Sequence, residues 1–282
     1  MNSIILIFKT RIKIEHAILL SIFLFSVFSC APTSKTVRTT PENEEIISQI
    51  DSISIINDAY LALDPLFAKD YVLIDASITA ESYILEETKK QLELKGYFID
   101  YGMSPMVGGF APTKEPIKVA NSRKDEKYSM TPPFYLDNQI NDEEYLNSLS
   151  DVNTSVLSAI KVGRTKLKES NDSIYKSLKL ISDRLGNDKA LIVIGDGKIV
   201  PTGKSLGQAF TVGILTTTIT LGMVTYFVYN VSYLDSYIAL LDLKTGELIW
   251  TNEIRLSSNP TKLKFYEKYW GERLFYHFPL KN

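Results

Sequence analysis

The sequence predicts an α/β (α+β) fold, in which a mixed sheet of about five strands has flanking helices and ends in a C-terminal antiparallel hairpin followed by a helix. Three observations predict this class. Two segments between residues 141 and 185 place apolar residues at helical spacing. Three runs rich in β-branched and aromatic residues are bounded by turn residues. Two further such runs near the C-terminus are joined by a tight turn.

The first half of the chain predicts a strand–helix–strand unit. Residues 43–68 carry isoleucines at roughly helical spacing and predict an opening helix. "YVLIDASI" (71–78) predicts a buried strand, "ESYILEETKKQLELKG" (81–96) a helix that Gly96 ends, and "YFIDYG" (97–102) a second strand. Residues 103–137 contain five prolines and predict a long loop.

The second half predicts helices, a third strand and the hairpin. The first helix begins near Asn141 and presents one apolar face: Tyr145, Leu149, Val152, Val156 and Ile160. A second helix runs from Asp172 to Leu185 and ends at Gly186. "KALIVIG" (189–195) is the third strand. Residues 230–243, the turn "KTGE" and "LIWTNEIRL" (248–256) form the hairpin, and Asn259-Pro260 opens a last helix.

The N-terminus has the three parts of an export signal. A basic leader precedes the apolar stretch "AILLSIFLFSVF" (17–28), and Ser29 and Cys30 follow. The residues "VFSC" (27–30) resemble the lipobox of bacterial lipoproteins, in which cleavage occurs before a cysteine that becomes lipid-modified. We therefore expect a signal peptide over 1–29, a flexible tether over 30–45 and one α/β domain over 46–282. An ordinary cleavable signal with an incidental cysteine is the alternative.

Acylation of Cys30 would make outer-membrane lipid the first partner of the domain. Each buried methylene contributes about 0.8 kcal/mol, so several acyl chains anchor a protein stably where one chain is marginal. No acidic residue directly follows Cys30, which favours an outer-membrane location with the domain facing the periplasm.

Charge and cysteine content exclude several classes of function. The net charge of −2 leaves no basic surplus for nucleic acid. Cys30 is the single cysteine, so the domain has no disulfide and no cysteine-based metal site. We expect no cofactor.

The stretch "GDGKIVPTGKS" (195–205) looks at first like a phosphate-binding loop. That motif needs glycine five places before Gly203, where this chain has Lys198, and Pro201 removes a backbone N–H from the loop. We interpret the segment as a turn leaving the third strand, with no nucleotide as ligand.

Candidate catalytic groups are few. His277 lies next to the C-terminus between two aromatic residues, where a packed or surface imidazole is the simpler interpretation. Asp75, Asp100 and Asp196 lie in or at the ends of predicted strands and could converge as a carboxylate site, although such residues more often form turns and caps. We assign no catalytic, cofactor-binding or metal-binding residue and expect no enzyme. A carboxylate-based hydrolase is the weaker alternative.

The thirty residues from Ser205 to Leu234 carry no charge. Their length suits a membrane span, but the threonine-rich composition of 209–229 favours strands, and an open strand cannot cross lipid. Three interpretations stay open: a buried part of the domain, a surface for an oligomer or partner, and membrane insertion.

The layout as a whole resembles a family of bacterial envelope lipoproteins. Cys30, the strand–helix–strand unit, "ALIVIGDG" and the final "YIALLDLKTGELIWTNE" hairpin are similar to the TolB-N-terminal-like group. This group includes the curli secretion lipoprotein and the lipoprotein activators of penicillin-binding proteins. The resemblance covers about residues 70–276 and implies a non-enzymatic lipoprotein that acts through envelope proteins or self-association. The alternative is an oligomeric secretion or transport component whose apolar insert contacts the membrane.

Overall fold

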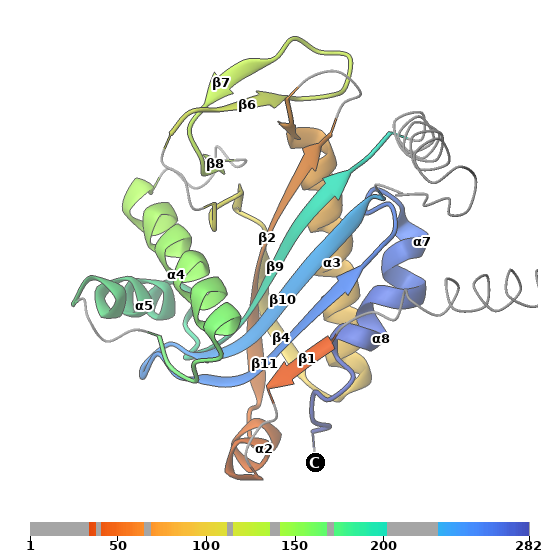
Figure 1. Cartoon of the computed structure of the whole chain (residues 1–282). Coiled ribbons are helices and arrows are strands. Elements are labelled where there is room, and N and C mark those ends of the chain that lie inside the picture. The colour runs from red at the N-terminus through yellow and green to blue at the C-terminus, as the bar shows by residue number, and fades with distance from the viewer. Residues whose placement is uncertain are drawn as a thin grey trace, which may run out of the picture. The chain divides into compact units, whose positions relative to one another are not determined.

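The computed structural model describes residues 34–37, 41–64, 69–111, 115–135, 142–167, 172–201 and 231–281 (Figure 1). By its internal contacts the chain divides into Met1–Thr33 and Ser34–Asn282. Every element described below belongs to the second unit.

Long and short strands are interspersed with helices along the chain. The strands are β1 (Ser34–Val37), β2 (Ser52–Leu63), β3 (Tyr71–Leu73), β4 (Phe98–Met103), β5 (Met106–Val107), β6 (Ile117–Ala120), β7 (Tyr128–Met130), β8 (Phe134–Tyr135), β9 (Lys189–Ile199), β10 (Tyr233–Asp242) and β11 (Leu248–Leu256). The helices are α2 (Pro41–Ser48), α3 (Ile74–Leu94), α4 (Glu143–Val162), α5 (Asp172–Leu185), α7 (Leu263–Phe265), the π-helical segment Tyr266–Trp270 and α8 (Gly271–Leu274).

One mixed sheet organises the described residues. Its nine strands follow the order β1-β11-β10-β9-β2-β3-β6-β7, and β4 also pairs with β2. β2 is parallel to β9, whereas β10 is antiparallel to both β9 and β11. The predicted fold class is confirmed, including the C-terminal hairpin and the helix after it. The sheet has four strands that were not predicted. β1, β6 and β7 have only three or four residues each, too few for a visible alternation, and β2 lies within the predicted opening helix.

Helices cover both faces of the sheet (Figure 1). Alternation along β2 sends Ile55 and Leu61 into a core with α3 and the C-terminal helices. Ile56 points the other way, into a core with α4 and α5. The central strands are therefore buried on both faces, and their sequences are almost continuously apolar.

Aromatic side chains close the core on the α3 side. The rings of Trp250 and Phe278 lie edge to face with centroids 4.8 Å apart. The indole N–H of Trp270 donates to Ser236 Oγ at 2.8 Å, which satisfies the only polar atom of a fully buried side chain. The C-terminal helices thus contribute large apolar area and one specific polar contact with the sheet.

The two helices with the clearest periodicity are confirmed. Asp142 caps α4 by accepting a hydrogen bond from the Tyr145 backbone N–H at 3.0 Å. Gly163 ends the same helix with φ of 73°, a conformation that glycine adopts without a steric penalty. The predicted apolar face of α4 is buried along its whole length.

The opening helix predicted over 43–68 is wrong beyond its first part. α2 ends at Ser48, and Ser52–Leu63 forms β2. The isoleucines of β2 supply two cores on opposite faces, so a subset of them falls at helical spacing by coincidence. The flexible tether expected over 30–45 contains regular secondary structure, because β1 and the start of α2 lie within it.

The strand predicted over 71–78 is shorter than expected, because β3 ends at Leu73 and α3 begins at Ile74. Inside the helix Ser77 Oγ donates to Leu73 O at 2.8 Å and Thr79 Oγ1 donates to Asp75 O at 2.7 Å. Through these bonds the hydroxyl groups of Ser77 and Thr79 are satisfied within the helix, although the composition of this segment favours a strand. β4 pairs with β2 in parallel, so the parallel strand–helix–strand unit begins at β2 and not at the strand predicted over 71–78.

The long loop expected over 103–137 contains strands. β6 and β7 form an antiparallel ribbon at the sheet edge, and β5 pairs with β8 in a small separate sheet. These strands were not predicted because each is short and is separated from the next by prolines and charged residues, which interrupt any periodic pattern.

Candidate functional site

One end of the large sheet gathers segments that lie far apart in the sequence. Tyr233 of β10 is paired with Lys198 of β9. Just beyond this pair, the Val200 backbone N–H donates to Ser232 Oγ at 2.9 Å. Residues 202–230, which include most of the uncharged stretch, therefore leave and re-enter the described structure at this end. We call it the exit end and define it by residues 199–201, 231–233 and 256–258.

The first strand also begins close to the exit end. β1 is antiparallel to β11, with Ser34 opposite Ile254 and Val37 opposite Thr251. β11 ends at Leu256, so Ser34, the first residue of β1, lies two residue pairs from the end of β11. The polarity of β1 means that the chain enters the sheet from this end and runs away from it (Figure 1).

Ion pairs organise the exit end. Lys198 Nζ lies 2.7 Å from Asp70 and 3.4 Å from Asp64. Arg255 makes a two-pronged contact with Asp235, at 2.6 and 2.7 Å. Lys198 thus has partners in the connection between β2 and β3, and Arg255 has a partner on the neighbouring strand β10.

A surface cavity of ≈ 390 Å³ lies beside the exit end. It is lined by Leu73, Asp75, Ala76, Asn121, Ser122, Arg123, Ile199, Asn259, Thr261 and Lys262. Arg123 and Lys262 give part of the lining a positive charge, which Asp75 offsets.

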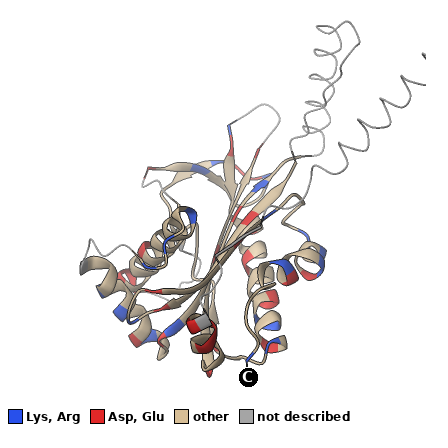
Figure 2. Cartoon of the chain, turned by 60° about the horizontal axis from the view of Figure 1, so that its bottom comes forward, with Lys and Arg blue, Asp and Glu red and all other residues tan. Residues whose placement is uncertain are grey.

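Over the described part of the chain as a whole, the helices carry Lys and Arg interspersed with Asp and Glu (Figure 2).

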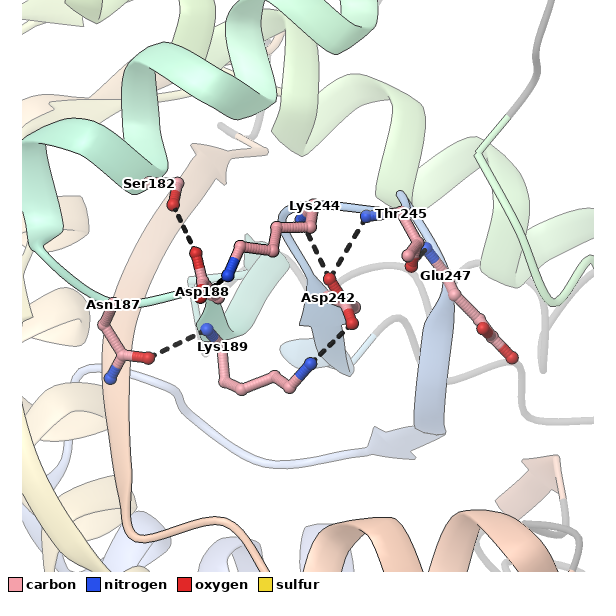
Figure 3. Close-up of polar contacts among 8 residues, drawn as sticks. All are labelled: Ser182, Asn187, Asp188, Lys189, Asp242, Lys244, Thr245 and Glu247. Atoms are coloured by element: carbon pink, nitrogen blue, oxygen red, sulfur yellow. Dashed lines mark hydrogen bonds and ion pairs between the residues drawn. The ribbon is translucent and has the colours of Figure 1, made fainter.

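The opposite end of the sheet holds a polar cluster around the turn between β10 and β11 (Figure 3). Lys189 Nζ contacts Asp242 at 2.5 Å, and Lys244 pairs with Asp188. The hydrogen bond from Lys244 holds the pKa of Asp188 below its usual value. Burial raises the pKa of Asp242, but Lys189 and the backbone N–H groups of the turn outweigh burial and lower it. This cluster fixes the turn in place.

The structure does not bring the three predicted aspartates together. Asp100 accepts a hydrogen bond from Ser52 at the start of β2, whereas Asp196 is paired with Tyr60, eight residues along that strand. At about 3.3 Å per residue these positions are roughly 26 Å apart. Asp75 lies elsewhere again, exposed in the first turn of α3. A shared carboxylate site built from these residues is therefore contradicted.

The interpretation of "GDGK" as a turn is also wrong, because β9 continues through it to Ile199. The glycines permit close packing inside the sheet. A Cβ at Gly195 would lie 3.0 Å from Ile84 Cδ1, and one at Gly197 would lie 3.0 Å from Tyr233 O. Packing against neighbouring side chains and backbone thus accounts for both glycines.

The other sequence-based candidates have different outcomes. His277 is exposed and its ring lies 4.4 Å from that of Tyr276. Cys30 and residues 205–230 lie outside the described residues, so the predictions made for them stay predictions. Within the described ranges, no helix is both long enough and apolar enough for a membrane span. The same ranges contain no group of three His, Cys, Asp or Glu residues placed to hold a metal ion.

A buried polar network in the middle of β2 was not predicted. β4 pairs with the first part of β2 and β3 with its last two residues, which leaves 57–61 without a strand partner on that edge. Side chains of α3 fill this gap. The backbone N–H of Ala59 donates to Glu81 Oε1 at 2.9 Å, and that of Leu61 donates to Ser77 Oγ at 3.0 Å. The helix therefore completes the hydrogen bonding of the strand.

Asp58 of β2 lies at the centre of the same network and is fully buried. Its Oδ1 accepts from the Gly108 backbone N–H at 2.7 Å, and its Oδ2 accepts from Asn153 Nδ2 of α4 at 3.3 Å. Burial raises the pKa of Asp58 to about 7, although these donors and the N–H groups of Gly109 and Phe110 act in the opposite direction. Asp58 thus joins β2 to α4 and to the loop after β5.

Burial and the nearby Asp58 charge also raise the pKa of Glu81 well above its usual value. Among the described residues Glu81 Oε2 has no hydrogen-bond partner, while Oε1 accepts from a single backbone N–H. Asp58 therefore has more donors than Glu81 to stabilise its charge. The hydrogen bonds of the two acids hold α3, α4 and a loop on the strand. The sequence did contain a signal for this network, because Asp58 is an acidic residue inside the apolar run "IINDAYLAL".

Comparisons with known proteins found little. The sequence matches no protein-family model and no curated protein. Among solved structures, the chain is similar to a dodecamer of PelC from Paraburkholderia phytofirmans, with 7% identity, a TM-score of 0.32, and coverage of 89% of this chain and 100% of that chain. A likeness this distant carries no argument about function.

Proposed function

We propose that this chain is a non-enzymatic lipoprotein, anchored in the outer membrane through acylated Cys30, that works through protein contacts in assembly or maintenance of the cell envelope. The observation that carries the proposal is the N-terminal pattern of basic leader, apolar stretch and Ser29-Cys30. A second observation supports it: β1 begins only four residues after Cys30 and belongs to the main sheet. A lipid at Cys30 would therefore hold a folded domain directly at the membrane.

Mass spectrometry and fractionation test the anchor. The N-terminal peptide of the mature protein should begin at Cys30 and carry the added mass of acyl chains. The variant Cys30→Ser should lose that mass and leave the membrane fraction, because a hydroxyl does not replace the thiol in the lipid-transfer reaction. An unmodified Cys30 thiol in the mature protein would overturn the proposal.

Crosslinking in native envelopes tests the proposed mode of action. If the domain works through contacts, the anchored protein should be recovered with one or a few envelope proteins, and the Cys30→Ser variant should lose them. Purified domain that turns over a defined envelope substrate would contradict a non-enzymatic role.

One observation favours a second candidate, an oligomeric secretion or transport component that contacts the membrane through its uncharged segment. The segment leaves and re-enters the fold at one end of the sheet, so it is attached there at both of its ends. Extraction separates the two candidates. A soluble, monomeric Cys30→Ala protein excludes membrane contact by the segment, whereas a protein that stays in membranes without its lipid supports the second candidate.

A further inference from the structure

We infer that the exit end of the sheet is the face that this domain turns toward the lipid bilayer. The inference rests on the proposed lipid anchor and adds an orientation to it. The surface concerned consists of described residues: 199–201, 231–233 and 256–258, together with the start of α7 beside them.

The position of β1 is the first argument. Cys30 is joined to Ser34 by four residue steps, which span at most about 14 Å even when fully extended. Ser34 is paired with Ile254, near the end of β11. An acyl chain on Cys30 would therefore pull the exit end toward the membrane. Leu256 lies two residues from Ile254, or about 7 Å, whereas the opposite end of β11 lies six residues from it, or about 20 Å.

The attachment of the uncharged segment is the second argument, and it is independent of the first. β9 ends and β10 begins at the exit end, so the residues between Pro201 and Val231 are tied to the same end as the anchor. From Ser205 to Leu234 this part of the chain has no charged residue. An uncharged, apolar-rich segment and a lipid anchor both find favourable surroundings at a bilayer.

The chemistry of the described surface is the third argument. Val231 and Leu263 are exposed at 45% and 42%, although both are apolar. Lys262 and Lys264 flank Leu263 at the exposed start of α7, the first helix after β11. Apolar side chains beside lysines suit the boundary between acyl chains and lipid phosphates.

Two exposed valines at opposite ends of the fold provide a matched test. Val231 lies at the exit end, whereas Val162 ends α4 and is 63% exposed. The chain just after Val162 is bonded to the β10–β11 turn, since Leu248 N donates to Thr165 O at 2.8 Å. Cys30 is the only natural cysteine, so acylation leaves a cysteine at either valine as the sole reactive thiol.

The experiment uses full-length, lipidated protein carrying Val231→Cys or Val162→Cys, labelled with an environment-sensitive fluorophore and reconstituted into vesicles that contain headgroup nitroxide lipids. We expect the label at 231 to be quenched several-fold more strongly than the label at 162. Leu263→Cys and Thr245→Cys form a second pair at the same two ends and should repeat the result. Equal quenching at both ends, or stronger quenching at 162 and 245, would overturn the inference.

Failure of the orientation is distinguishable from failure of the proposed function. If the protein carries no lipid and does not associate with vesicles, the anchor itself is wrong. If it is acylated and vesicle-bound but the two ends are quenched equally, the anchor stands and only the orientation falls. Thermal unfolding of each labelled variant identifies one that has lost its fold, and the other pair of sites then decides the outcome.

Discussion

Replacing Asp58 with asparagine should flatten the pH dependence of stability. The pKa of this carboxyl rises from 3.8 to about 7 on folding because it is fully buried. The folded protein therefore holds the proton more tightly than the unfolded chain does. Stability contributed by the protonated group is fully present below pH 4 and is lost as pH rises toward 7. A shift of about three units corresponds to about 4 kcal/mol at 1.36 kcal/mol per unit.

Urea denaturation of the wild type and Asp58→Asn at about pH 4 and about pH 8 measures this change. The difference in unfolding free energy between the two pH values should shrink by about 4 kcal/mol in the variant. An asparagine amide facing the Gly108 N–H has a cost of its own, but that cost is the same at both pH values and cancels in the difference. Loss of the Asp58 charge also lowers the pKa of Glu81, which flattens the profile further.

Glu86→Gln is the matched control, since Glu86 is an exposed carboxylate of α3. Its pH profile should follow that of the wild type. If Asp58→Asn keeps the full pH dependence of the wild type, Asp58 titrates as an ordinary surface carboxylate, and the argument from burial in β2 fails.

Two further substitutions test the packing of β2 and β9. Gly197→Ala should destabilise the domain by about 1–3 kcal/mol, because the new methyl group would overlap Leu61 and crowd the Tyr233 carbonyl; unchanged thermal stability would contradict the packing role of this glycine. Ser77→Ala should cost about 1–3 kcal/mol in urea denaturation, because the backbone N–H of Leu61 loses its acceptor. Ser82→Ala on the exposed side of the same helix should have little effect, and equal losses from the two serines would refute a specific role for Ser77.

Local periodicity predicted the elements that bury a single face. α4 and α5 have apolar residues at helical spacing, a predicted start near Asn141 and a predicted end at Gly186, and the structure agrees on these points. The hairpin of β10 and β11 has a turn with Gly246 at φ of 69°, which the sequence "KTGE" indicates directly. In these cases the information lies within one segment.

The elements that the sequence failed to predict depend on two neighbours at once. β2 and β9 are buried on both faces, so Ile53 and Ile56 gave a false helical spacing and "GDGK" gave a false turn. Asp58 is bonded to the loop after β5, and Glu81 is bonded to the edge of β2 because α3 fills a gap between two strands. No single segment contains that information.

The gap in the sheet beside β2 also sets which parts of the fold open together. The amide hydrogens of Ala59 and Leu61 are bonded to side chains of α3 rather than to a strand. They can exchange with solvent only when the first half of α3 leaves the sheet, and that movement exposes Asn57, which is bonded to Glu81 O. Strand and helix therefore form one cooperative unit of hydrogen exchange. Peripheral elements such as the β6–β7 ribbon, whose residues 128–130 are exposed, can open without disturbing it.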